Sequence, residues 1–211
     1  MQQRSIAISL PATGEDEWQA IREPLTTGWL TQGPKVAAFE QAFAARHGVA
    51  HALATTSCTT GLHLILAGLN IGPGDEVVVP AFTWVATANV VVYCGATPVF
   101  ADVDRVTYNI DPVDVARRIT PRTKAVIAVH LFGLCADMEA LRAVVPSHIP
   151  IIEDAACAAG ANYKGTSAGD LGVAAAFSFH PRKSITTGEG GMVTTNDSDL
   201  AEVANMLRNH G

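Results

Sequence analysis

Hydrophobic and polar positions along the chain follow two patterns in alternation. Residues 33–48 place Val36, Phe39 and Phe43 at steps of three and four and stop at Gly48, as an amphipathic helix does. Other segments of helical period follow, and shorter apolar runs lie between them. The further helix candidates are 59–69, 83–93, 111–119, 137–145 and 198–211.

The shorter apolar runs are bounded by turn residues and predict β-strands. Several of them are apolar at successive positions, which suits strands covered by helices on both faces. Because strands and helices alternate, we expect an α/β fold of three αβα layers around a mainly parallel sheet. The strand candidates are 49–55, 76–80, 97–103, 124–130, 149–154, 174–179 and 191–195.

Composition narrows the class of protein. The 211 residues are 48% hydrophobic and only 16% charged, against about 25% in a usual soluble chain, which excludes a disordered protein. A net charge of −6 argues against nucleic acid as a partner, because phosphate binding needs a basic face. The sequence has no apolar stretch long enough for a membrane span, and we expect no secretory signal, because its first residues lack a sustained apolar run. The cysteines show no C-x-x-C pair or zinc spacing, so we expect no metal and a cytoplasmic location.

Two charged residues follow predicted strands, at the edge of a parallel sheet where ligands gather. Asp154 suits a helix cap or a surface salt bridge, or else an acid that holds a protonated ring nitrogen. Lys183 precedes a glycine-rich turn at 188–191. Alone it suits a solvated charge, but a partly desolvated lysine amine can form an imine with an aldehyde. Ser178 and His180, which flank it, could bond a phosphate or the surroundings of the imine.

Two further segments supply polar and aromatic groups. Ser57, Thr59 and Thr60 precede an apolar helix whose first N–H groups and dipole attract phosphate, although the same residues suit an N-cap. Trp84 follows the strand 76–80 and suits either stacking on a flat heterocycle or packing in a core. Together, a phosphate anchor, a stacking ring, an acid for a ring nitrogen and a lysine for an aldehyde match what pyridoxal 5'-phosphate (PLP) requires.

In this order the motifs resemble the DegT/StrS-type family of PLP-dependent sugar aminotransferases. The resemblance extends over nearly the whole chain and implies the large domain of PLP-dependent transferases of fold type I. Its motifs are GWLTQGPKVAAFEQAFA, SCTTGLHL, IGPGDEVVVPAFTWVATAN, GATPVFADVD, NIDP, ITPRTKAVIAVHLFG, IIEDAACAAGANYKG, FSFHPRKSITTGEGG and LRNHG.

The resemblance implies a role for each candidate residue. Lys183 matches the lysine that binds the PLP aldehyde covalently, Asp154 the acid that pairs with the pyridine nitrogen, and Trp84 the ring that stacks on the cofactor. The other implied cofactor positions are Ser57, Thr59, Thr60 and Ser178 at the phosphate and Cys157 near the 3-oxygen. The implied substrate-binding positions are His180 and, in the loop 28–34, Thr31, Gly33 and Pro34.

Two positions depart from the family pattern. Family members commonly read S-G-T or S-A-T where this chain has Ser57, Cys58 and Thr59, and we expect phosphate binding to survive because Cys58 is still small. Cys157 stands where a glutamine, histidine or glutamate is usual, and a thiol is a weak hydrogen-bond partner. We therefore expect Cys157 to change the tuning of the cofactor and the substrate subclass.

Family chains continue well past LRNHG and form homodimers in which the partner subunit contributes to each site. We therefore expect 1–211 to be most of the PLP-binding large domain of a longer protein, without its small carboxy-terminal domain. The implied activity is transfer of an amino group from an amino acid, expected to be glutamate, to a nucleotide-linked keto-sugar.

Two alternatives stay open. A related branch of the family dehydrates sugars and has a histidine at the lysine position, so Lys183 favours amino transfer over dehydration. A non-catalytic or regulatory member would keep the fold and lose the reaction. Cys157 and the end of the chain favour this second alternative, whereas Lys183 and Asp154 oppose it.

Overall fold

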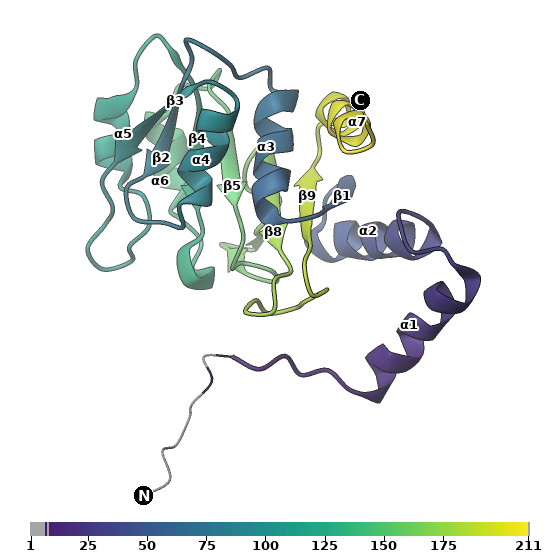
Figure 1. The fold of residues 1–211 in the computed structure, drawn as a ribbon. Helices are drawn as coiled ribbons and strands as arrows, with labels where there is room; N and C mark the ends of the chain where they lie inside the picture. Colours follow the sequence, from purple (N-terminus) through teal and green to yellow (C-terminus); the bar gives the residue numbers. More distant parts are fainter. Residues whose placement is uncertain (1–6, 8, 211) are drawn as a thin grey trace, which may run out of the picture.

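The computed structural model describes residue 7 and residues 9–210, and a seven-stranded β-sheet lies at the centre of this part of the chain. Its strands lie in the order β1-β9-β8-β5-β4-β2-β3 (Figure 1), and each coincides with one of the strand candidates. Their bounds are β1 His51–Thr55, β2 Glu76–Pro80, β3 Thr97–Ala101, β4 Thr123–Val129, β5 Ile151–Asp154, β8 Ala174–Ser178 and β9 Gly191–Thr195. A separate ribbon pairs β6 (Asn162–Tyr163) with β7 (Thr166–Ser167).

The sheet is mainly parallel, as predicted. Strands β3, β2, β4, β5 and β8 pair in parallel, whereas β9 runs antiparallel to both of its neighbours, β8 and β1. Thr55 at the end of β1 and Ser178 at the end of β8 both pair with Gly191. The carboxyl ends of β1 and β8 therefore lie at one edge of the sheet, beside the start of β9.

Helices cover both faces of the sheet and complete the three αβα layers. Val77 and Val79 belong to the core that contains residues of α3, α4 and α7, whereas Val78 between them belongs to the core with residues of α5 and α6. Phe43 of α2 packs on this second face, against Phe177. The bounds are α2 Pro34–His47, α3 Cys58–Gly68, α4 Ala86–Tyr93, α5 Pro112–Arg118, α6 Met138–Val144 and α7 Ser198–Leu207.

The first helix, α1 (Glu15–Thr27), is not among the sequence candidates. It contains Pro24, which in a sequence normally marks a helix end or a kink, and none of its residues is buried. In Figure 1 it lies away from the sheet and is joined to α2 by a short loop. Three acidic residues in its first turn, Glu15, Asp16 and Glu17, complement the helix dipole and were the available sequence signal.

The description leaves out residues 1–6, 8 and 211, so both ends of the predicted domain 1–211 lie outside the described residues. In the part that is described, none of the helices has the length and apolar character needed to cross a membrane.

Candidate active site

Side chains from several elements point to one face of the sheet at its carboxyl edge. Ile152 of β5 packs in the core that contains residues of α3 and α4, so Asp154, two residues later, points to the same face. Ala176 of β8 also packs in that core, which places Ser178 on this face as well. The structure therefore brings Asp154 and Ser178 to the side of the sheet that α3 and α4 cover.

The N-terminus of α3 is held by reciprocal capping. The Ser57 side chain accepts a hydrogen bond from the Thr60 backbone N–H at 3.1 Å, and the Thr60 hydroxyl lies 3.0 Å from the Ser57 backbone N–H. The other N–H groups of a first helical turn have no partner within the helix, and the helix dipole makes this end attractive to an anion. Both explanations given for this segment from the sequence are thus compatible, because the cap leaves donors free for a phosphate.

Gly191 lies against this helix start. A Cβ atom at position 191 would lie 2.5 Å from the carbonyl carbon of Ser57 and 2.7 Å from the backbone nitrogen of Cys58. Only a residue without a side chain allows this approach of β9 to the first turn of α3. The glycine-rich turn predicted to border a ligand thus also fixes where the helix N-terminus lies.

Asp154 is 4% exposed and accepts hydrogen bonds through both carboxylate oxygens. Oδ2 accepts from the Thr87 hydroxyl at 2.8 Å, and Oδ1 accepts from the Ala156 backbone N–H at 3.2 Å. The Cys58 thiol lies 3.7 Å from Oδ1. None of the ion pairs found in residues 7 and 9–210 includes Asp154. A buried carboxylate in this position can accept a further donor, and a cationic one would suit it best.

The neighbouring acid, Glu153, has a different environment. It is fully buried and accepts from His130 Nε2 at 2.8 Å and from the backbone N–H groups of Gly169, Leu171 and Gly172 at 2.7 to 2.8 Å. These donors satisfy its carboxylate, so Glu153 joins the loop after β7 to the sheet and offers nothing to a ligand.

Lys183 lies in the loop after β8 and is half-buried. Its Nζ is 3.0 Å from the sulfur of Cys157, and its backbone N–H donates to the carbonyl of His180 at 2.8 Å. The pKa of the Cys58 thiol is raised well above its usual range, first by burial and then by the negative charge of Asp154, and the positive charge of Lys183 opposes that rise. The charges of Asp154 and Lys183 therefore act on the same buried thiol.

The other predicted site residues are Trp84, His180 and those of the turn that begins α2. The Trp84 side chain is 77% exposed and lies before α4. The His180 side chain is 3.9 Å from Glu189, and its Nδ1 accepts from the Arg182 backbone. Thr31, Gly33 and Pro34 lie in the turn that begins α2, and no described contact joins them to Asp154 or Lys183.

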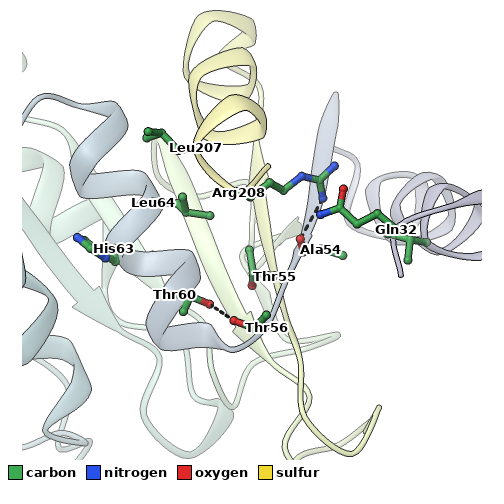
Figure 2. A pocket seen from close by; sticks show the side chains of 10 residues that line it. Gln32, Ala54, Thr55, Thr56, Thr60, His63, Leu64, Leu207 and Arg208 are labelled. Carbon is green, nitrogen blue, oxygen red and sulfur yellow. Dashed lines mark hydrogen bonds between the residues drawn. The ribbon is translucent and has the colours of Figure 1, made fainter. Parts of the chain in front are cut away.

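A pocket of about 430 Å³ borders the N-terminus of α3, and neither Asp154 nor Lys183 lines it. Figure 2 shows Thr56 and Thr60 at its floor and Gln32, from the same turn as Thr31 and Gly33, across from them. Arg208, at the end of α7, forms an ion pair with Glu40 and donates a hydrogen bond to the Ala54 carbonyl at 3.0 Å. The predicted substrate loop thus borders, through Gln32, the helix end that is predicted to bind phosphate.

Two buried contacts of Asp154 were not identified from the sequence. Thr87 lies in the motif IGPGDEVVVPAFTWVATAN, where it has the pattern of an ordinary helix residue. Cys58 stood out in the sequence only for its small size. The signal available was spacing, since Thr87 falls one helical turn after Thr83 and three residues after Trp84.

The residues meet the chemical needs of PLP. Asp154 is a buried carboxylate that has no ion-pair partner among the described residues. A pyridinium N–H would supply that partner. The N-terminus of α3 offers donors to a phosphate, and Lys183 is a half-buried amine 3.0 Å from the sulfur of Cys157.

Comparison with known proteins is consistent with this site. The model of the DegT/DnrJ/EryC1/StrS aminotransferase family matches residues 11–211. The spore coat polysaccharide biosynthesis protein SpsC of Bacillus subtilis is 50% identical over 207 residues, 98% of this chain and 53% of that protein. GDP-perosamine synthase of Caulobacter vibrioides is 48% identical over 208 residues, 98% of this chain and 56% of that protein.

A Streptococcus pneumoniae protein solved in its PLP form superimposes with a TM-score of 0.94 at 33% identity, covering 99% of this chain and 59% of that one. The chain thus spans about half the length of the curated relatives that it matches.

Proposed function

The chain belongs to the DegT/DnrJ/EryC1/StrS aminotransferase family, and on this basis we propose that the protein is a PLP-dependent sugar aminotransferase. It moves an amino group from an amino acid, glutamate, to a nucleotide-linked keto-sugar. The observation that carries the proposal is the buried Asp154 carboxylate, which is hydrogen-bonded through both oxygens but has no cationic partner among the described residues. The similarity to GDP-perosamine synthase supports a nucleotide-linked substrate.

The chain's own groups divide the work. PLP, when bound, supplies an aldehyde and a ring that accepts electron density. Lys183 would hold the cofactor through its amine at the aldehyde carbon and, when free, would act as a base at the donor's α-carbon. Asp154 holds a proton at the ring nitrogen. The first turn of α3, with Ser57, Thr59 and Thr60, binds the phosphate together with Ser178.

Other parts of the site complete the proposal. Trp84 covers the ring of the cofactor, and Cys157 lies near its 3-oxygen. Thr31, Gly33, Pro34 and His180 contact the substrate. Residues 1–211 form most of the cofactor-binding large domain of a longer protein, which acts as a cytoplasmic homodimer.

The test is covalent trapping of the cofactor. The chain is incubated with PLP, reduced with borohydride and digested, and the labelled peptide is identified by mass spectrometry. We expect the label on Lys183 and its loss in Lys183→Ala. Lys164→Ala is the matched control, because Lys164 is an exposed lysine that is paired with Glu139 and is not among the predicted site residues, and this variant should keep the label. Labelling of any other lysine in preference to Lys183, or no labelling, would contradict the assignment.

The alternative activities are separated by the product. With glutamate labelled with ¹⁵N in its amino group and a nucleotide-linked keto-sugar, amino transfer places the label in the sugar. A dehydratase would release water and leave the sugar unlabelled. A non-catalytic member would give neither product, and Lys183→Ala should abolish amino transfer in an active protein.

A further inference from the structure

Among the described residues, Thr87 makes the shortest hydrogen bond to the Asp154 carboxylate. Its side chain is fully buried in α4, and its hydroxyl lies 2.8 Å from Oδ2. The backbone N–H of Ala156 donates to the other oxygen, Oδ1, so both hydrogen bonds to the carboxylate suit its ionised form. An ionised carboxylate only accepts hydrogen bonds, so Thr87 is the donor to Oδ2.

This fixes the direction of a second hydrogen bond. The hydroxyl oxygens of Thr83 and Thr87 lie 3.1 Å apart. Since the single proton of the Thr87 hydroxyl is directed to Asp154, the Thr83 hydroxyl must be the donor to Thr87. A hydroxyl that accepts one hydrogen bond donates its own proton more strongly. Thr83, Thr87 and Asp154 thus form a relay in which every hydrogen bond points toward the carboxylate.

We propose that Thr87, supported by Thr83, is a positioning residue that keeps Asp154 ionised and turned toward the ring nitrogen of the cofactor. This inference rests on the proposed function. Donors at a carboxylate favour its charged form, so a ring proton placed between the two stays on the nitrogen. The hydrogen bond also fixes the rotation of the carboxyl group, which leaves its remaining lone pairs to the ligand.

The relay explains a feature of the sequence that stacking alone does not. Thr83 immediately precedes Trp84, and Thr87 follows one helical turn later. The segment before β3 therefore acts on the cofactor ring at two places. Trp84 lies at the face of the ring, and the threonine pair acts on its nitrogen through Asp154.

The experiment measures the protonation of the ring nitrogen directly. PLP labelled with ¹⁵N in the ring is bound to the full chain, and its nitrogen signal and dissociation constant are measured in the wild type and in variants. In Thr87→Val, which removes the hydroxyl at nearly the same volume, we expect the signal to move toward that of the unprotonated ring. The dissociation constant should rise about tenfold or more, as expected for the loss of a hydrogen bond to a charged group.

Variants separate this role from packing. Thr87→Ser keeps the hydroxyl and should keep the wild-type signal, whereas Thr87→Ala, offered in case the valine does not fold, should behave like Thr87→Val. Thr83→Val should give a smaller shift in the same direction. If Thr87→Val or Thr87→Ala binds PLP with the wild-type nitrogen signal, the inference is overturned while the proposed function stands. A wild type that binds no PLP would overturn both.

Discussion

The four cysteines of the chain differ in surroundings and therefore in reactivity. The pKa of Cys58 is raised well above the usual thiol range by burial and by Asp154, and burial also raises the pKa values of Cys94 and Cys135. A thiol with a raised pKa has little of the reactive thiolate at pH 8. Cys157 is exposed and lies beside the amine of Lys183.

We expect a thiol reagent at pH 8 to label Cys157 first and Cys58 last. The measurement is the rate of labelling at each cysteine by mass spectrometry of the folded chain. Unfolding in urea should bring all four rates together, because it removes the burial. In Cys157→Ser the fast phase should disappear. Labelling of Cys58 as fast as Cys157 in the folded chain would mean that the Cys58 thiol is not buried.

At the scale of single residues, the sequence indicates candidate residues at the ends of strands more clearly than the residues that position their side chains. Asp154 and Lys183 are candidates because a charged residue after an apolar run is conspicuous. Thr87 was not found, since its role depends on how α4 is rotated against β5, and a threonine in a helix carries no such information. Trp84 illustrates a different limit: both stacking and core packing were open, and its exposure now argues against the core.

At the scale of elements, the close approach of β9 to α3 sets the position of the turn that is predicted to bind phosphate. We expect Gly191→Ala to push the helix start away from the sheet, because the new methyl would overlap the backbone of Ser57 and Cys58. Overpacking of this kind costs about 1–3 kcal/mol in the free energy of unfolding. Urea unfolding measures that cost, and titration should show weaker binding of PLP with little change for pyridoxal, which lacks the phosphate.

Gly72→Ala is the matched control for this prediction. A Cβ at position 72 would lie 3.8 Å from the nearest heavy atom, the carbonyl oxygen of Cys94, which is an ordinary contact. That variant should keep both stability and PLP affinity. Equal binding of PLP by Gly191→Ala and the wild type would show that the α3 N-terminus does not hold the phosphate.

Helices and strands with a packed face were predicted well because burial imposes a period on the sequence. The pattern in 33–48 gave α2 nearly to the residue, and Gly48 ends it with a φ of 73°. α1 was not predicted, because a helix that buries no residue has no such period in its sequence and because it contains Pro24. The antiparallel direction of β9 was also outside the pattern, because an apolar strand buried on both faces reads alike in either direction.

At the scale of the whole molecule, stability should depend on pH through His47. Its ring is 3% exposed, its Nδ1 lies 2.7 Å from the Ala168 carbonyl, and it stacks on Phe43. Burial lowers its pKa below the ordinary value of about 6.5. Between that value and the folded pKa the unfolded chain binds more protons, so the free energy of unfolding should fall as the pH falls from 6.5.

Urea unfolding between pH 7.5 and 5.5 measures this dependence. We expect His47→Gln to flatten it, because the side chain can no longer take up a proton. The matched control is His148→Gln, which changes an exposed histidine and should leave the wild-type slope. A slope that survives in His47→Gln would assign the effect to another group.

The pairing of β1 with β9 has a consequence for how the protein is made. Thr55 meets Gly191 across the sheet, so the first strand to leave the ribosome stays without its neighbour until the chain has grown to the ninth. The start of α3, which is predicted to bind phosphate, packs against that same glycine. Contacts between such distant segments form slowly, and an unpaired strand is open to aggregation while it waits. The contact between β9 and the start of α3 therefore forms only after β9 has been made, and a nascent chain released before residue 195 would present β1 as a bare edge.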